Sequence, residues 1–316
     1  MDKKGVISLG EAFVDFISTD QTNTKYQQLL GGATVNLAAG TSRLGIPTYY
    51  LCKLGTDEIS HFVEQELKKE RINTEFCVRT PSKKICGVYV HIYESSERYF
   101  YSYINETPDE VLIENQLKKE LFELAKIFYF GSGTLFHEIA KKTTETGLKY
   151  AKESEMLVAF DANLRLKRWE SENHCRQIVC SIIKNADIVK FAEDELLFLT
   201  ETKSIEAGLE KAYQWKIPYL FVTMGGNGAF AVYNGTRVDV PGVQVNAIDT
   251  TGAGDAFMAA ILYCFHEKGK PAEPSQLTEY IHFANHAGAA VTTEFGSLTA
   301  NFDMRELKKQ FQKNGL

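Results

Sequence analysis

The stretch Ala247-Ile-Asp-Thr-Thr-Gly-Ala-Gly-Asp-Ala-Phe-Met-Ala-Ala-Ile-Leu262 places two glycines and a carboxylate where an apolar helix begins. Glycine lowers the stability of a helix interior by roughly 1 kcal/mol relative to alanine, so Gly252 and Gly254 must serve another purpose. A helix start carries unpaired N–H groups and about half a positive charge, and glycines let an anion approach them closely. This pattern predicts a phosphate site at residues 252–254.

Asp255 lies in the first turn of that helix, where its negative charge would repel a phosphate. A carboxylate in this position suits a general base that takes a proton from an attacking hydroxyl. Because a helix start lowers the pKa of a carboxylate, we expect a weak base, which phosphoryl transfer tolerates. The alternative is structural: Asp255 only caps the helix dipole, and the glycines only form a turn.

Strand-like and helix-like segments alternate along most of the 316 residues. The segments with a strand pattern are 6–9, 48–54, 127–130, 157–160, 188–190 and 219–223. Those with a clear helix pattern include 33–44 and 57–69. Such alternation is typical of βαβ units, so we predict a parallel sheet covered by helices. An Asn-Gly pair at 234–235 predicts a further hairpin.

Residues 74–105 break this rhythm, because they show no helical period. Residues 85–93 alternate between an aliphatic face and a face with aromatic rings, and a second alternating run carries tyrosines at 99, 101 and 103. We predict a hairpin with its turn at 94–97. The stretch 13–26 is a candidate for a further strand of the same small sheet. A small β element inserted into an α/β domain is a candidate lid. An ordinary edge hairpin is the alternative.

Composition and charge exclude several classes of protein. The net charge of −6 and the lack of a basic cluster argue against nucleic acid and membrane surfaces as partners. No apolar run is long enough to cross a membrane, and no signal-peptide core follows the N-terminus, so we expect a cytoplasmic protein. The six cysteines form no CxxC pair and are expected to be reduced, and the seven histidines show no metal-binding spacing.

Two further glycine-rich stretches precede or follow predicted elements. Gly31-Gly-Ala-Thr-Val-Asn36 opens a helix and offers both backbone N–H groups and the Asn36 amide to a ligand with hydroxyls, although a plain strand-to-helix turn explains it as well. Thr223-Met-Gly-Gly-Asn-Gly228 follows a strand and suits the phosphates of a nucleotide. Neither a Walker P-loop nor a dinucleotide-binding GxGxxG pattern is present.

Two signatures identify a family. They are Gly31-Gly-Ala-Thr-Val-Asn-Leu-Ala-Ala39 and Asp249-Thr-Thr-Gly-Ala-Gly-Asp-Ala-Phe257, and with them the chain resembles the ribokinase (PfkB-type) carbohydrate kinases along essentially its whole length. The resemblance implies a three-layer α/β/α sandwich with a mostly parallel central sheet and a small β-sheet lid. It implies one kinase domain over residues 1–316, with the lid formed by insertions at about 12–28 and 74–106.

The resemblance also implies roles for individual residues. The phosphoryl-transfer residues would be the base Asp255 and an anion hole of backbone amides at Gly252, Ala253 and Gly254. The sugar-binding residues would be Asp15, Gly31, Gly32 and Asn36, to which we add Tyr101 and Arg165. The nucleotide-binding residues would be Thr223, Gly225, Gly226, Gly228 and Asn285, with Lys190 and Glu193.

Two metal ions follow from the same resemblance. The Asn-x-x-Glu motif of the family, which is linked to Mg²⁺ and the phosphates of ATP, is read here as Lys190-Phe-Ala-Glu193, with lysine in place of asparagine. Many relatives bind K⁺ beside the anion hole. The matching ligands would be Asp249, Thr251, Val291, Glu294 and Gly296.

The stretch 161–169 reads D-x-N-x-R-x-x-x-W and resembles the bacterial fructokinase branch, which shares it with 2-keto-3-deoxygluconate kinases. Acid sugars need cationic groups, ideally arginine, and the lid strand offers Tyr101-Ser-Tyr103 where a second arginine is expected. We therefore predict a neutral sugar and ATP-dependent phosphorylation of D-fructose to fructose 6-phosphate. The resemblance implies a homodimer formed through the lid, and the aliphatic face of residues 85–93 would suit its interface. The alternatives are a 2-keto-3-deoxygluconate or riboside kinase and a catalytically silent sugar-binding regulator.

Overall fold

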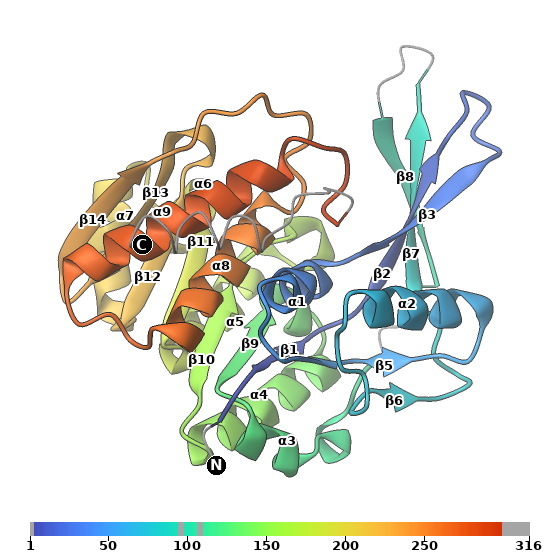
Figure 1. Ribbon diagram of the computed structural model, residues 1–316, viewed down its shortest axis with the longest axis horizontal. Coiled ribbons are helices and arrows are strands. Elements are labelled where there is room, and N and C mark those ends of the chain that lie inside the picture. The colour runs from blue at the N-terminus through green and yellow to red at the C-terminus, as the bar shows by residue number, and fades with distance from the viewer. Residues whose placement is uncertain (1–2, 94–97, 106–109, 299–316) are drawn as a thin grey trace.

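The computed structural model of the chain describes residues 3–93, 98–105 and 110–298. In this part of the chain the largest sheet has eight strands in the order β14-β13-β12-β11-β10-β9-β1-β4 (Figure 1). Their bounds are β1 Val6–Leu9, β4 Thr48–Leu51, β9 Ile127–Gly131, β10 Leu157–Asp161, β11 Ile188–Ala192, β12 Tyr219–Thr223, β13 Gly228–Tyr233 and β14 Thr236–Pro241. All neighbouring pairs are parallel except β12 with β13 and β13 with β14, which confirms the mostly parallel sheet.

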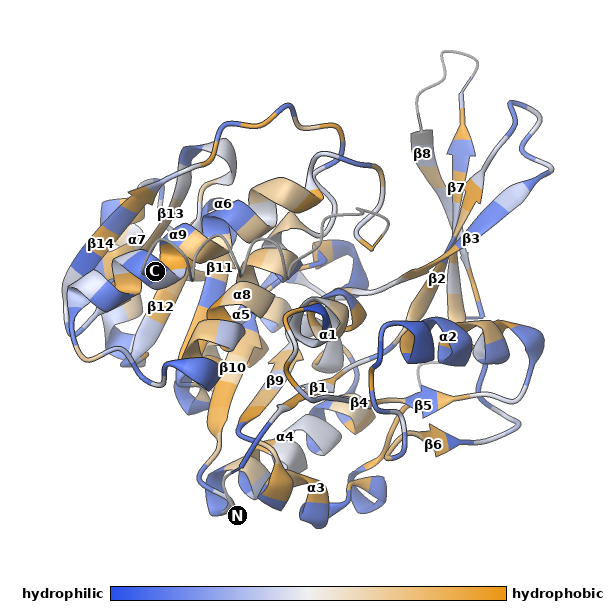
Figure 2. Cartoon of the chain, in the orientation of Figure 1, coloured by the Kyte–Doolittle hydropathy of each residue, from blue (hydrophilic) through white to orange (hydrophobic). Residues whose placement is uncertain are grey.

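The central strands are apolar on both sides because helices cover both faces of the sheet. In β9, Ile127 and Tyr129 pack on one side, while Phe128 and Phe130 pack on the other. Figure 2 shows β9 and β10 as largely hydrophobic strands inside helices whose outer surfaces are more polar.

The helices form a layer on each face of the sheet. One layer contains α1 Ala33–Arg43, α8 Ala253–Glu267 and α9 Pro274–Val291. The other contains α3 Lys119–Leu124, α4 Glu138–Glu153, α5 Glu172–Ile182, α6 Glu193–Thr200 and α7 Ile205–Ala212. The predicted three-layer sandwich is thus confirmed. No helix within the described ranges has the length and apolar content needed to cross a membrane.

Short 3-10 turns connect several of these elements: η1 Glu114–Gln116, η2 Ser132–Thr134, η3 Leu166–Arg168, η4 Ile183–Asn185, η5 Tyr213–Trp215 and η6 Gly225–Asn227. The predicted strand 48–54 is divided into β4 and the short β5 Lys53–Leu54. The predicted helix 57–69 is α2 Glu58–Lys69, whose N-cap Asp57 accepts a hydrogen bond from the amide of Ser60. The Asn-Gly hairpin between β13 and β14 is confirmed, with positive φ at both Asn234 and Gly235.

The sheet has a topological switch point beside its strand β1. The chain runs from β1 outward to β4 and later returns to place β9 on the other side of β1. The loops that follow β1 and β9 therefore leave the sheet in different directions, and ligands of open α/β sheets bind in the crevice formed between such loops.

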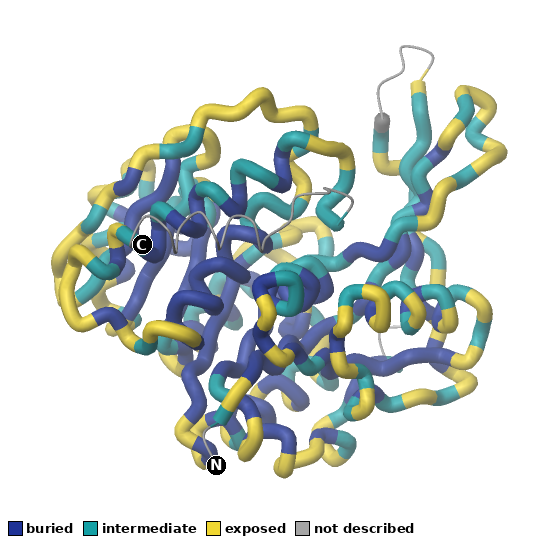
Figure 3. Tube along the Cα trace, viewed as in Figure 1, coloured by how far each residue is buried: buried dark blue, intermediate teal, exposed yellow. Residues whose placement is uncertain are grey.

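A second sheet projects from this body, at the upper right of Figure 1. In the described residues it has the order β3-β2-β7-β8, with β2 Phe13–Ser18, β3 Tyr26–Gly31, β7 Cys86–Ile92 and β8 Arg98–Ile104. The predicted hairpin and the addition of the 13–26 stretch are confirmed, whereas the predicted turn at 94–97 lies outside the described residues. Part of the segment 74–85 pairs elsewhere, since β6 Val78–Arg79 lies beside β5. Figure 3 shows the far end of this sheet as mostly exposed or half-buried.

Candidate active site

A cleft of about 940 Å³ lies where β1 and β9 end. Its floor includes Gly10 after β1, Ser132 after β9 and the start of α8, and its wall includes residues of the small sheet. Ligand pockets commonly measure about 300–1,000 Å³, so the cleft has room for a sugar and the phosphates of a donor. It lies at the switch point of the main sheet, as the topology leads us to expect.

The start of α8 is built around two glycines, as predicted. Gly252 has φ +82°, and a methyl group on it would lie 2.5 Å from Cβ of Ser297. A methyl group on Gly254 would lie 3.0 Å from Nζ of Lys190. Of the predicted anion-hole amides, that of Ala253 donates to the carbonyl of Thr250 in this structure. Gly252 and Gly254 line the cleft directly, so their backbone is open to a ligand.

Asp255 lies at the floor of the cleft and is 7% exposed. Its Oδ2 accepts a hydrogen bond of 2.8 Å from Nδ2 of Asn36 on α1. Burial raises the pKa of Asp255 to about 7, and the negative charge of Asp161 adds to the rise, while the Asn36 hydrogen bond and the charge of Lys190 oppose it. The weak base expected from the helix start is therefore corrected: burial and the charge of Asp161 raise the pKa, and the carboxylate titrates near neutral pH.

Asn36 is held on both sides of its amide. Its Nδ2 donates to Asp255, and its Oδ1 accepts a hydrogen bond of 2.9 Å from Oγ of Ser297. The predicted contact of Asn36 with a sugar stays a prediction. Ser297 was missed in the sequence because nothing local marks a serine 261 positions away as a partner.

Asp15 lies on β2 and faces the cleft from the small sheet. Its Oδ2 is 2.7 Å from the position a methyl group on Gly31 would take, so the two predicted sugar-binding positions are brought together. Gly32, which precedes α1, also lines the cleft. Burial raises the pKa of Asp15 to about 6, so its carboxylate is still ionised and accepting at neutral pH.

Tyr101 is not among the residues that line the cleft. Its ring stacks on that of His91, with centroids 3.9 Å apart, and the side chain is 59% exposed. The cause is a register shift in the pairing of β7 with β8, between Tyr89 and Val90. One extra residue in β8 interrupts the alternation of faces, so Tyr103 lines the cleft while Tyr101 lies on the opposite face.

The aliphatic face of β7 was expected at a dimer interface, but it lies elsewhere. The aliphatic face, with Cys86 and Val88, lines the cleft, whereas the aromatic face, with Tyr89 and His91, packs against rings of β2, β3 and β8. The expectation that the aliphatic face serves a dimer interface is therefore corrected, because that face is turned toward the cleft.

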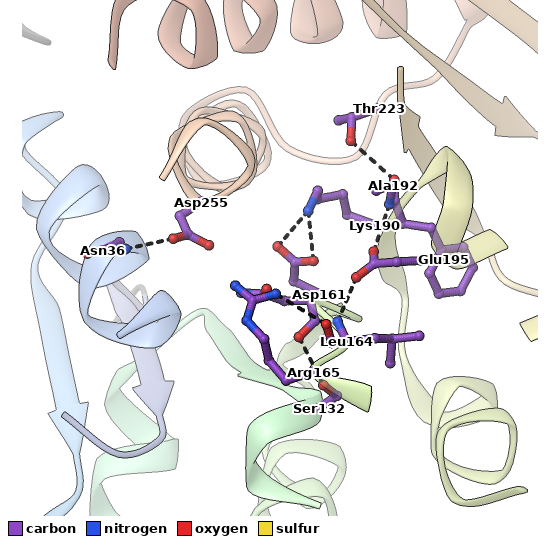
Figure 4. Close-up of polar contacts among 12 residues, drawn as sticks. Asn36, Ser132, Asp161, Leu164, Arg165, Lys190, Ala192, Glu195, Thr223 and Asp255 are labelled. Carbon is purple, nitrogen blue, oxygen red and sulfur yellow. Dashed lines mark hydrogen bonds and ion pairs between the residues drawn. The ribbon is translucent and has the colours of Figure 1, made fainter. Parts of the chain in front are cut away.

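Three ionisable side chains that the sequence did not bring together lie beside the floor of the cleft (Figure 4). Nζ of Lys190 on β11 lies 2.9 and 3.0 Å from the two carboxylate oxygens of Asp161 on β10. Glu195 accepts hydrogen bonds from the amides of Leu164 and Ala192. Burial raises the pKa of Glu195; burial alone would lower the pKa of Lys190, but the charges of Asp161 and Glu195 raise it.

Glu195 is the acid buried next to this pair, and the role of Glu193 in holding Mg²⁺ stays a prediction. Glu193 begins α6 and is half-buried, while Glu195 is 8% exposed. Three acidic residues follow one another at 193–195, so the sequence alone does not show that Glu195 is the one that is buried. The available signal was capping: an acid at the third helical position bonds back to the residue before the helix, as Glu195 does with Ala192.

Arg165 lines the cleft from the exposed loop after β10, as predicted for a sugar-binding residue. Arg168, which was not predicted, lines it too. The guanidinium carbon of Arg168 lies 4.9 Å from the ring centre of Tyr103 on the small sheet. A second arginine thus reaches the cleft from the main body, although the lid strand contributes none at residues 101–103.

The predicted nucleotide loop follows β12, and its residues 225–227 are exposed. Thr223 ends the strand, Gly225 and Gly226 lie in η6, and the carbonyl of Gly228 accepts a hydrogen bond from Met224. Asn285 on α9 is buried, and its Nδ2 donates to the carbonyls of Val240 and Pro241. In this structure the Asn285 amide therefore joins α9 to the end of β14, and its role near adenine stays a prediction.

Three of the predicted K⁺ ligands lie together. The carboxylate of Asp249 accepts hydrogen bonds from the amide and hydroxyl of Thr251 and from the amide of Gly296. Val291 ends α9, and Glu294 is exposed in the loop that follows. In the part of the chain that the structure describes, no three His, Cys, Asp or Glu side chains gather into a metal-binding group. A K⁺ site here would instead use the Asp249 carboxylate and backbone oxygens, a donor set that suits a hard cation.

A family model described as pfkB family carbohydrate kinase matches residues 3–303. The chain belongs to this family and is a sugar kinase, an enzyme that transfers a phosphoryl group. It is 32% identical over 303 residues to probable fructokinase-5 of Arabidopsis thaliana, which covers 93% of this chain and 93% of that one.

Solved structures with the same fold include two bacterial fructokinases. That from Vibrio cholerae O395, bound to fructose, ADP and calcium ion, has a TM-score of 0.84 at 29% identity over 97% of this chain and 98% of that chain. A double mutant of the same enzyme, bound to fructose, ADP and potassium ion, has a TM-score of 0.83 at 28% identity over 98% and 99%. The enzyme from Xylella fastidiosa with bound ATP has a TM-score of 0.85 at 25% identity over 99% and 100%.

Proposed function

We propose that this sugar kinase transfers the γ-phosphoryl group of ATP to the 6-hydroxyl of D-fructose, with Asp255 as the general base. The observation that carries the proposal is the position of Asp255: buried at the floor of the cleft, next to the glycine backbone of α8, with a pKa of about 7. A base is most effective when its pKa lies near the working pH. The curated and structural relatives named fructokinase support the choice of sugar.

The mechanism assigns a task to each wall of the cleft. Asp15 and Gly31, on the small sheet, hold sugar hydroxyls; Asp255 takes the proton of the attacking hydroxyl; and the amides at the start of α8 stabilise the transferring phosphoryl group. Magnesium would be held by the donor phosphates and by Glu193, the predicted ligand, and supplies charge neutralisation to those phosphates. Closure of the small sheet as a lid would exclude water, whose attack on ATP is the competing reaction.

The test is ADP release with magnesium and ATP against fructose, 2-keto-3-deoxygluconate, ribose, an aminoimidazole riboside, tagatose and no sugar. Strong selectivity for fructose supports the proposal. Turnover on a riboside alone would overturn fructose as the acceptor sugar but retain phosphoryl transfer from ATP. Absence of turnover with sugar binding retained would favour the silent regulator.

A kinase of an acid sugar is the second candidate, and one observation favours it. Arg168 joins Arg165 in the cleft, so two guanidinium groups are available for a carboxylate. If 2-keto-3-deoxygluconate is the preferred sugar, Arg168→Ala should lower its kcat/KM and leave that of fructose nearly unchanged. The selectivity for fructose in the same panel decides between the two.

We also propose a monovalent cation site at Asp249, Thr251 and Gly296. Replacing K⁺ by tetramethylammonium at constant ionic strength should lower turnover several-fold, because that ion is too large to enter a site of backbone oxygens. Asp249→Ala should lower turnover in K⁺ and abolish the difference between the two salts. Equal rates of the unaltered enzyme in both salts would contradict the site. The potassium ion bound by the Vibrio cholerae double mutant supports the proposal.

We further propose a homodimer formed through the aromatic face of the small sheet. Tyr93 and Tyr101 on this face are 51% and 59% exposed, and exposed aromatic surface of this kind marks interfaces. Light scattering should give about twice the monomer mass of 35.6 kDa. Tyr101→Glu should produce monomers, whereas Tyr213→Glu, a substitution of an exposed tyrosine far from this sheet, should not. A monomeric unaltered chain at micromolar concentration would refute the dimer.

A cytoplasmic location is part of the same proposal. Cys52, Cys77, Cys175, Cys180 and Cys264 are free thiols in the structure, which suits a reducing compartment.

A further inference from the structure

We propose that the hydroxyl of Tyr129 holds a water molecule at the floor of the cleft and that this water donates a hydrogen bond to the carboxylate of Asp255. The inference rests on the proposed function and deepens it, because it adds a residue that controls the ionisation and orientation of the proposed base. Tyr129 acts through the water, so it is a positioning residue.

A row of hydroxyl side chains crosses the main sheet on the face covered by α1 and α8. The parallel register makes Ser8 on β1 the direct partner of both Tyr50 on β4 and Tyr129 on β9. Residues paired across neighbouring strands point to the same face of a sheet, and the strands are about 4.8 Å apart. The three side chains therefore lie side by side in one row.

Two of these three hydroxyls have a partner on α1. Oγ of Ser8 donates to the carbonyl of Thr34 at 2.8 Å, and the hydroxyls of Tyr50 and Thr34 lie 3.0 Å apart. Tyr129 is fully buried, and its hydroxyl has no hydrogen-bond partner among the described residues. A buried polar group in this state is destabilising, and folded proteins usually supply it with a water or a ligand.

The unpartnered hydroxyl lies close to the base. Tyr129 and Asp255 both line the cleft. Burial raises the pKa of Tyr129 well above its ordinary value, and the negative charges of Asp161 and Asp255 raise it further. The hydroxyl therefore keeps its proton and is available as a donor, but it makes no direct bond to either carboxylate. A water fits between such groups, because it can accept from Tyr129 and donate to Asp255.

A second donor would improve Asp255 as a base. Within the described residues its carboxylate accepts one hydrogen bond, that from Asn36. A further hydrogen bond favours the ionised form and restricts rotation of the carboxylate, so that it stays directed at the hydroxyl of a bound sugar. The alternative is that the hydroxyl of Tyr129 is only a packing defect, which would leave Asp255 unaffected.

NMR titration of the Asp255 carboxyl tests the inference in the full chain without ligands. The carboxyl carbons of the aspartates are isotopically labelled, and Asp255→Asn identifies the signal. Tyr129→Phe keeps the ring and removes the hydroxyl, so the pKa of Asp255 should rise by about half a unit to one unit, the loss expected from one hydrogen bond.

Tyr50→Phe is the matched control. It removes a buried hydroxyl from the same row, but Tyr50 is bonded to Thr34 and is not among the residues that line the cleft. The pKa of Asp255 should stay unchanged in this variant.

The charged groups that act on Asp255 are Asp161 on β10, Lys190 on β11 and Arg165 in the loop after β10. Both tyrosine variants keep all three, so a shift confined to Tyr129→Phe reports the loss of the hydroxyl and its water. The pH dependence of turnover should move by the same amount, which lowers kcat at about pH 7 roughly threefold.

Two outcomes overturn the inference: an unchanged pKa of Asp255 in Tyr129→Phe, or an equal rise in Tyr50→Phe. An unchanged pKa together with a higher melting temperature would identify a packing defect, because removal of an unpaired buried group stabilises a protein. Failure of the proposed function is recognised separately. A chain that phosphorylates no sugar but shows the rise in pKa would refute the fructokinase assignment and retain the contact between Tyr129 and Asp255.

Discussion

Replacing Asp255 with asparagine should lower the turnover number by roughly 10²- to 10⁴-fold, the range that a general base contributes, while sugar binding survives. Asparagine has nearly the same shape and can still accept the hydrogen bond from Asn36, so the cleft should keep its geometry. Initial rates with saturating fructose and ATP, together with fructose binding by calorimetry, measure the two effects. Near-normal turnover would remove Asp255 from the role of base.

The pH dependence follows from the same carboxylate. Asp255 is active when deprotonated, and its pKa is about 7, so turnover should rise between about pH 6 and about pH 8 and then level off. The residual turnover of Asp255→Asn should lack this rise. A pH profile of the unaltered enzyme that is flat through neutral pH would contradict the assignment.

The burial of Asp255 also affects the free energy of unfolding. Its pKa is raised from 3.8 to about 7, so between these values the folded state holds more protons than the unfolded state. Stability from this group is therefore lost as the pH rises through that window. At pH 8 we expect Asp255→Asn to melt about 6 °C higher than the unaltered chain, since an uncharged side chain avoids the free-energy cost of a buried carboxylate.

Replacing Asp15 with alanine should raise the KM for the sugar by about 10²-fold, because two charged hydrogen bonds to hydroxyls are lost. The KM for ATP should change little, since Asp15 lies on the small sheet. Below pH 6 the unaltered enzyme should show the same weakness, because the pKa of Asp15 is about 6 and a protonated carboxyl is a poorer acceptor.

Asp20→Ala is the matched control for Asp15. Asp20 lies in the exposed turn between β2 and β3, away from the cleft, and its removal should leave both KM values nearly unchanged. Equal effects of Asp15→Ala on the two substrates would place Asp15 outside the sugar site.

Periodicity predicted the main sheet well because each central strand is a continuous apolar run. Strands 6–9 and 219–223 have the predicted bounds, and β9, β10 and β11 extend beyond their predictions by one or two residues at their ends. β9 and β10 end on Gly131 and Asp161, which are not part of the apolar runs, so the hydrophobic pattern stops one residue before each strand does.

Contacts between distant segments explain what the sequence could not predict. The extra residue in β8 that turns Tyr101 away from the cleft depends on pairing with β7, and no local signal marks it. The Lys190–Asp161 pair depends on the register of two strands 29 residues apart. The position of the glycines and of Asp255 at the start of α8 was predictable because the pattern lies within one turn of one helix.

The small sheet and the start of α8 come from opposite ends of the chain. Asp15, Gly31 and the cleft-facing residues of β7 and β8 lie within the first third of the sequence, while Gly252, Gly254 and Asp255 lie in its last quarter. On the proposed assignment, a substitution at Asp15 alters the contact to the acceptor sugar and leaves the segment that carries the base and the phosphate-binding backbone unchanged.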